Sequence, residues 1–107
     1  MKFNYDYDLL SLMYQDHSYS QHTVDKIRDN IIDIINFFEC EDFLFHEIQD
    51  QFDLLTIKIN QIKDELSLNG EEIDFIGKES IEEAISYIIE FFKIDISLED
   101  ALRKKEW

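Results

Sequence analysis

The sequence predicts an all-α, single-domain helical bundle of three long and two short helices. The chain has no proline and only two glycines among its 107 residues, so little interrupts a helix. Hydrophobic residues make up 45% of the chain, and they recur at the spacings of three and four that mark amphipathic helices. A chain of this length forms one domain and can bury a proper core. The predicted domain spans residues 1–107.

The first predicted helix is short and runs from Asp6 to about Gln15. Its apolar stripe consists of Leu9, Leu10, Met13 and Tyr14. Residues 16–20 are polar and rich in capping types, which predicts a turn. A second helix follows, and its apolar residues again recur at spacings of three and four: Val24, Ile27, Ile31, Ile34 or Ile35, and Phe38.

The third predicted helix has the strongest periodicity in the chain. Its apolar residues share one stripe: Phe45, Ile48, Phe52, Leu55, Ile59, Ile62 and Leu66. Leu54 and Ile57 lie beside this stripe and widen it, which favours a bundle over an isolated two-stranded coiled coil. Asn69-Gly70 ends the helix, because both residue types tolerate a left-handed backbone at a helix C-terminus.

The fourth predicted helix runs from about Glu71 to Lys93. Glu71, Glu72 and Asp74 are expected in its first turn, where the positive end of the helix dipole favours acidic side chains. Its inner face is predicted to hold Ile73, Ile76, Ile81, Ala84, Ile85, Ile88 and Phe92. Ser97 is typical of the N-cap of a last short helix that reaches Leu102. Because no helix can bury its stripe alone, the three long helices are expected to pack antiparallel around one core.

The charge of the chain excludes several classes of partner. Its 25 acidic residues outnumber 10 lysines and arginines, which gives a formal net charge of −15. Nucleic acids and anionic membrane surfaces would repel such a protein, so neither is an expected partner. The first residues lack the apolar region of a signal peptide, and no apolar run approaches the roughly 20 residues of a membrane span. We therefore expect a cytoplasmic protein that is monomeric when free.

No catalytic, metal or cofactor site is predicted. The glycines do not form a phosphate-binding loop, and His17, His22 and His46 lack the spacing of a metal site. Cys40 cannot form an internal disulfide, and its acidic neighbours make it a poor nucleophile. His22 and Asp25 are one helical turn apart and could share a cation. The simpler interpretation is a solvated histidine near the start of a helix.

Two acidic columns are the most informative feature of the surface. Like charges four residues apart destabilise a helix, and a helix selected only for solubility usually carries lysine at that spacing. Each column is either a solvated face or a surface kept negative for a basic partner. Tyr87 within the second column either anchors an interface or lies at the edge of the core. The predicted partner-binding residues are Glu79, Glu83, Tyr87 and Glu90 on the fourth helix, and Asp25, Asp29 and Asp33 on the second.

Several short blocks of the chain resemble a known family in the same order. The blocks are Met13-Tyr14, Asp16, Tyr19, His22, Val24-Asp25-Lys26-Ile27, Ile59-Asn60, Asn69-Gly70, Glu72-Ile73, Glu79, Ile81 and Glu106-Trp107. They resemble the bacterial domain-of-unknown-function family numbered 5713 over nearly the whole chain. The chain departs from this pattern at Ser20, Ser80 and Lys105, where the family tends to carry proline, cysteine and arginine. The resemblance implies a small helical cytoplasmic protein and no established activity.

The leading functional hypothesis is an acidic inhibitor or immunity protein. It would neutralise a basic bacterial toxin, with a nuclease as the favoured target, by occluding the positive cleft that holds phosphates. Its field would also speed association. The alternatives are a small enzyme or ligand-binding domain that uses His22 and Asp25, and a general protein-interaction module. Inhibition requires no cofactor.

Overall fold

Five helices form the described part of the chain, which comprises residues 2–5, 8–40 and 42–107 of a computed structural model. They are α1 (Ser11–Gln15), α2 (Gln21–Glu39), α3 (Phe45–Leu68), α4 (Phe75–Phe91) and α5 (Leu98–Ala101). These residues include no strand, so the predicted all-α bundle of three long and two short helices is confirmed. No helix in the described ranges combines the length and the apolar character that crossing a membrane requires.

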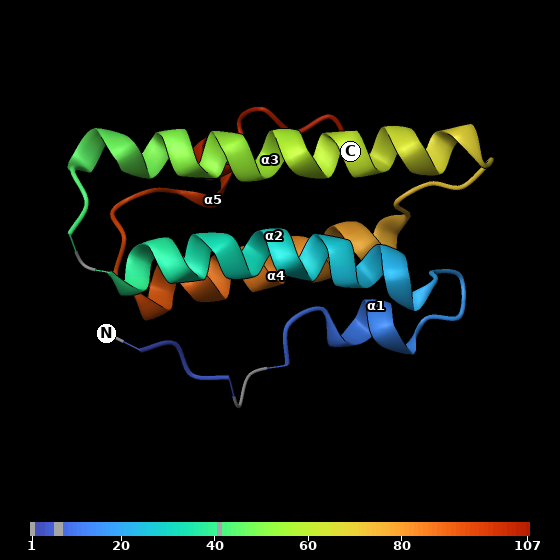
Figure 1. Ribbon diagram of the computed structural model, residues 1–107, viewed down its shortest axis with the longest axis horizontal. Helices are drawn as coiled ribbons and strands as arrows, with labels where there is room; N and C mark the ends of the chain where they lie inside the picture. The colour runs from blue at the N-terminus through green and yellow to red at the C-terminus, as the bar shows by residue number, and fades with distance from the viewer. Residues whose placement is uncertain (1, 6–7, 41) are drawn as a thin grey trace.

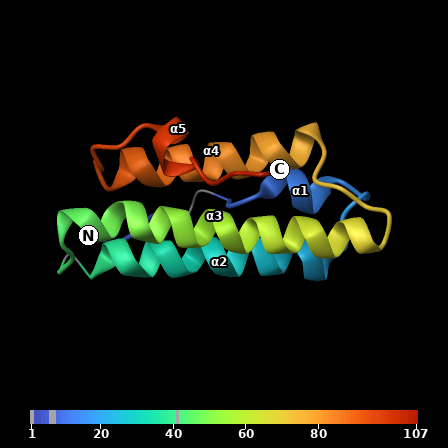
Figure 2. The same cartoon turned by 90° about the horizontal axis from the view of Figure 1, so that it is seen from above.

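The helices are arranged in two layers. α2 and α3 lie side by side and antiparallel, while α4 and α5 lie behind them (Figures 1 and 2). The short helix α1 lies below α2 in Figure 1 and packs against the start of α4. α5 contacts both α3 and α4, so it closes the space between the layers.

One hydrophobic core fills the space between these layers. The predicted stripe of α2 is buried along its full length, from Val24 to Phe38. Most of the predicted stripes of α3 and α4 are buried as well. Phe45 is an exception, because it is the first residue of α3 and its side chain is 78% exposed. Ile76 is another, since it faces outward on α4 and is 41% exposed.

The start of α4 differs from the prediction. The helix begins at Phe75, so Glu71 and Glu72 precede it and do not lie in its first turn. Asp74 is the N-cap residue, and its side chain accepts a hydrogen bond of 3.0 Å from the backbone N–H of Gly77. An aspartate that caps a helix has an extended backbone itself, which is why the acidic run does not continue the helix.

The starts of α2 and α5 agree with the prediction, and the start of α1 does not. Ser20 and Ser97 cap α2 and α5 by accepting hydrogen bonds from backbone N–H groups three residues later. α1 begins at Ser11, later than expected, after Leu10 with a left-handed backbone at a φ of 62°. The predicted start at Asp6 lies outside the described residues.

The C-terminal segment is fastened to α3 by one buried asparagine. The Asn60 Nδ2 atom donates a 2.8 Å hydrogen bond to the carbonyl oxygen of Lys104. Its Oδ1 atom accepts one of 3.0 Å from the backbone N–H of Glu106. Trp107 follows and is only 8% exposed. The segment after α5 is therefore part of the folded body.

Candidate functional site

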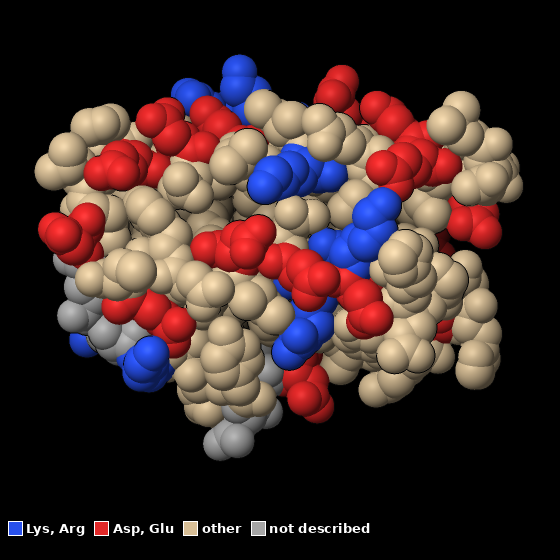
Figure 3. All heavy atoms as spheres, in the orientation of Figure 1, with Lys and Arg blue, Asp and Glu red and all other residues tan. Residues whose placement is uncertain are grey.

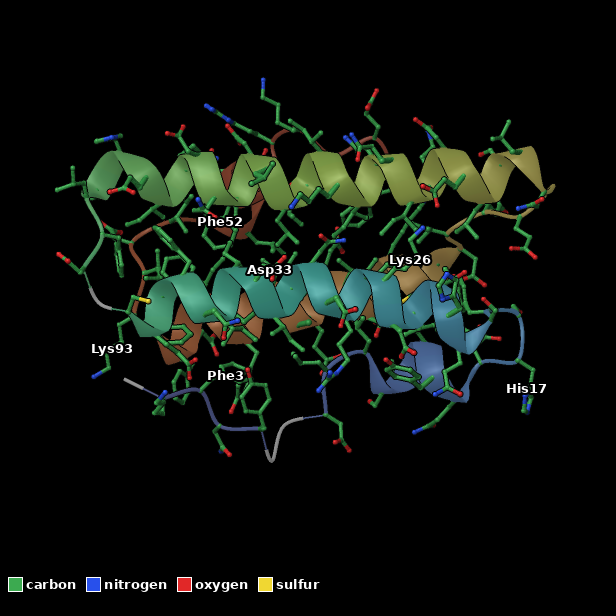
Figure 4. All side chains as sticks on the ribbon, in the orientation of Figure 1. Phe3, His17, Lys26, Asp33, Phe52 and Lys93 are labelled. Carbon is green, nitrogen blue, oxygen red and sulfur yellow. The ribbon has the colours of Figure 1, made fainter. Side chains whose placement is uncertain are left out.

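The α2 column (Asp25, Asp29 and Asp33) lies on the outer side of the front layer. Figure 3 shows a diagonal row of acidic side chains across the middle of this face, and Figure 4 shows Asp33 on the edge of α2 that faces α3. Asp29 and Asp33 are exposed. Asp25 is only half-exposed, because its Oδ1 atom accepts a 2.6 Å hydrogen bond from the Tyr14 hydroxyl. Asp25 therefore helps to hold α1 against α2.

The α4 column (Glu79, Glu83 and Glu90) lies on the outward side of the rear layer. All three side chains are exposed, while the opposite side of α4 is buried. Tyr87 is set apart from this column, since it is half-buried and packs against the core. Its ring lies edge-on to Phe3, with ring centroids 5.6 Å apart, which places it at the edge of the core.

Most carboxylates of the two columns have no bonding partner among the described residues. Among the described residues, the carboxylates of Asp29, Asp33, Glu79, Glu83 and Glu90 form no hydrogen bond or ion pair. Ion pairs lie elsewhere on the surface: Lys26–Glu65 at 2.5 Å, Arg103–Asp53 at 2.6 Å, Lys105–Glu82 at 2.8 Å and Lys63–Asp64 at 3.4 Å. The acids of the two columns, Asp25 apart, are therefore not neutralised within the described part of the molecule.

Basic residues distinguish the two columns. Lys26 and Arg28 lie on α2 within the same turns as Asp25 and Asp29, and Figure 3 shows basic side chains on both sides of the acidic row. The outward face of α4 holds Ile76, Ser86 and the three glutamates, with no lysine or arginine between Glu79 and Glu90. The α4 column therefore presents a more uniformly negative surface.

His22 and Asp25, which lie one turn apart on α2, have different surroundings. Asp25 is engaged by Tyr14 on the α1 side of α2. His22 lines a depression on the α3 side of that helix, together with Glu65 and Leu66. Across the described ranges, no group of three or more histidine, cysteine, aspartate or glutamate residues is placed to hold a metal ion. Cys40 is exposed at the end of α2.

An apolar groove next to the α4 column was not predicted from the sequence. It is an open depression of about 680 Å³ between α1 and α4, lined by Leu12, Gln15, Asp16, His17, Ser18 and Ile76. Leu12 and Ile76 are 43% and 41% exposed. The spacing of apolar residues predicted Ile76 on the inner face of its helix, and the structure places it in this depression instead.

A tyrosine and an aspartate join the turn after α1 to the start of α4. The Tyr19 hydroxyl donates to Asp74 Oδ1 and accepts a 3.0 Å hydrogen bond from the Asp74 backbone N–H. Burial, followed by the hydrogen bond to Asp74, raises the pKa of Tyr19 to about 12. The Tyr19 hydroxyl and the Gly77 N–H both stabilise the ionised Asp74 carboxyl, so the pKa of Asp74 lies below its ordinary value.

Many residues of the family-like blocks have structural roles of this kind. Tyr14 binds Asp25, Tyr19 holds the cap of α4, and Asn60 binds the backbone of Glu106. Glu79 differs, because it is exposed and has no hydrogen-bond or ion-pair partner in the described part of the chain. His22 and Glu72 are exposed as well. Packing therefore explains the first group of residues and does not explain Glu79, His22 or Glu72.

Comparison with known proteins identifies a family and no individual relative. A model described as a family of unknown function, DUF5713, matches residues 3–107. No curated protein and no solved structure matches the chain.

Proposed function

We propose that this chain, which belongs to the DUF5713 family, is an acidic inhibitor that binds a basic surface of a partner protein through the α4 column. The observation that supports this proposal is the set of three exposed glutamates, Glu79, Glu83 and Glu90, that have no partner among the described residues and no lysine or arginine between them. Unpaired like charges on one helix face raise the free energy of the free protein. A basic partner would remove that repulsion on binding.

The target class follows from the chemistry of phosphate binding. A nuclease needs lysine, arginine or protonated histidine to hold the phosphates of its substrate, so its cleft is positive. Carboxylates four residues apart on a helix are separated by about 6 Å along its axis. A rigid helix with this array would occupy the cleft and exclude the nucleic acid. We propose a toxin of this kind as the target.

The long-range field would act on the rate of association. A net charge of −15 attracts a positive cleft before contact, and such steering raises association rates by about 10–10³-fold. At 0.15 M salt the Debye length is about 8 Å, so the effect weakens as ionic strength rises. An inhibitor that must act before its target cuts nucleic acid benefits from this speed.

Capture from a lysate of the native host tests the binding face. The baits are wild type, the double variant Glu83→Lys/Glu90→Lys, and the matched control Asp29→Lys/Asp33→Lys, which makes the same charge change on α2. Mass spectrometry is expected to find a basic protein held by wild type and by the α2 variant, and lost from the α4 variant. Asp25 is left unchanged because its replacement would also break the bond to Tyr14. Capture by wild type and by the α4 variant, with loss from the α2 variant, would contradict the choice of face.

Inhibition is tested with the purified partner. If the partner cleaves DNA or RNA, a stoichiometric amount of the wild-type protein is expected to block cleavage, and Glu83→Lys/Glu90→Lys to block it far less. Stopped-flow association rates are expected to fall as salt rises. If the partner binds and its activity is unchanged, the chain is a binding protein and the proposed inhibition is refuted.

A further inference from the structure

The groove between α1 and α4 joins an apolar surface to the α4 column. Leu12 and Ile76 line it from the two helices, and each side chain leaves about two fifths of its surface exposed. Ile76 and Glu79 are three residues apart on α4, so they lie on the same face one turn apart. The groove therefore continues the proposed binding face beyond its carboxylates.

An apolar contact supplies what the carboxylates lack. Exposed charge pairs each contribute little to affinity, whereas a desolvated apolar anchor near the centre of an interface contributes much of it. Tyr87 is unsuited to this role, because its ring already packs against Phe3 at the edge of the core. Leu12 and Ile76 are the exposed apolar side chains that meet in one depression beside the α4 column.

One acidic side chain lines the groove, and two more follow it along α4. Asp16 lines the groove, and Glu79 and Glu83 follow Ile76 along the outward face of α4. A binding segment therefore needs an apolar side chain for the floor and positive charges for the rim. A second copy of this chain does not fit, because its net charge of −15 would meet a surface of the same sign.

We propose that this groove binds a basic amphipathic segment of the partner protein, with one apolar side chain between Leu12 and Ile76 and flanking lysine or arginine against Asp16, Glu79 and Glu83. The proposal rests on the function proposed above and adds the anchor and the chemistry of the bound segment. Binding of an amphipathic helix in an apolar groove is a common mode of peptide recognition. The acidic side chains select a positively charged segment, and the groove fixes the position of its apolar side chain along α4.

A synthetic peptide tests the groove directly. The probe carries leucine and lysine at helical spacing, and a control peptide has the same lysines with each leucine replaced by glutamine. Binding to the full chain is measured by calorimetry, and ¹⁵N-labelled protein shows which backbone amides shift. The leucine peptide is expected to bind at least about tenfold more tightly than the control, with the largest shifts around Leu12 and Ile76.

Matched variants separate the groove from apolar surface in general. Ile76 and Ile57 are both 41% exposed, and Leu12 and Leu54 are 43% and 46% exposed. Ile76→Gln and Leu12→Gln are expected to weaken binding of the leucine peptide at least about tenfold, while Ile57→Gln and Leu54→Gln on α3 change it less than about twofold. The substitutions keep the charge, and unfolding midpoints show whether each variant is folded.

The outcomes distinguish this inference from the proposed function. If Glu79→Gln/Glu83→Gln weakens binding while both groove variants bind like wild type, the groove is refuted and the charged face stands. Equal binding of the two peptides, or equal effects of the α1–α4 and α3 variants, would likewise refute it. If the groove variants lose binding while the charge variant keeps it, the apolar contact in the groove is supported. The proposed electrostatic binding through the α4 column is then refuted.

Discussion

Replacing Gly77 by alanine tests how the start of α4 is held. Gly77 is buried in the first turn of α4, directly beside Tyr19. A Cβ atom there would overlap the Tyr19 hydroxyl oxygen and lie 2.9 Å from Cγ2 of Ile73. The Tyr19 ring would have to move, and its hydrogen bond to Asp74 would break. The substitution is therefore expected to destabilise the protein, although alanine favours a helix.

The magnitude follows from three opposing effects. Alanine favours a helix over glycine by about 1 kcal/mol. Overpacking costs about 1–3 kcal/mol, and loss of a hydrogen bond to a charged group costs about 1.5–3 kcal/mol. The expected net loss is about 1.5–5 kcal/mol, a large part of the roughly 5–15 kcal/mol that stabilises a typical domain. Urea unfolding followed by far-UV circular dichroism measures it.

A double-mutant cycle identifies the cause. In a Tyr19→Phe background the hydroxyl is absent, so Gly77→Ala should cost at least about 1 kcal/mol less than in wild type. Gly70→Ala is the control, because Gly70 has a φ of 73° and open space where a Cβ atom would lie. It should cost about 1 kcal/mol in both backgrounds. A Gly77→Ala variant that is as stable as wild type, or that loses the same stability in both backgrounds, would refute the predicted overlap with Tyr19.

Three further predictions concern the C-terminal segment, a strained residue and acid stability. Asn60→Ala should lower the free energy of unfolding by about 2 kcal/mol, because it releases the two backbone groups that Asn60 binds. It should also expose Trp107 and shift its fluorescence to the red, and an unchanged spectrum would contradict the fastening role. Lys93→Gly should raise stability by about 1 kcal/mol in urea unfolding, because Lys93 is exposed and has a φ of 56°; equal or lower stability would refute the strain. Since the pKa of Asp74 is lowered in the fold, its ionised form stabilises the protein above the unfolded pKa of about 3.9, and this contribution is lost as pH falls below it. Asp74→Asn should therefore be less stable at pH 7 and lose less stability on acidification from about pH 5 to 3; parallel pH profiles would contradict this.

Local sequence was sufficient for most of the secondary structure. The spacing of isoleucine, leucine and phenylalanine identifies the buried faces of α2 and α3, since these contacts repeat with the helical period. Ser20 and Ser97 mark helix starts because a cap bonds to a backbone N–H three residues away. The excess of acidic residues is likewise a property of composition, and it directs the functional hypothesis toward a basic partner.

Contacts between distant residues decided what each predicted site residue does. Asp25 bonds to Tyr14 and Tyr87 packs on Phe3, so neither is as free as its position in a column suggested. Asp29 lies one turn further along α2 than Asp25 and is exposed.

The boundary of α4 and the groove beside it also required the tertiary structure. Residues 71–74 are compatible with a helix, yet Asp74 is the N-cap of α4. The hydroxyl of Tyr19, which lies 55 positions earlier in the chain, holds Asp74 in this role. Ile76 matches the buried stripe of α4 in spacing, but it lines an open depression beside α1 and is 41% exposed. Periodicity and capping act within about four residues and can be read along the chain. Exposure and pairing depend on which elements the fold brings together, so only the packed structure distinguishes a free carboxylate from a bound one.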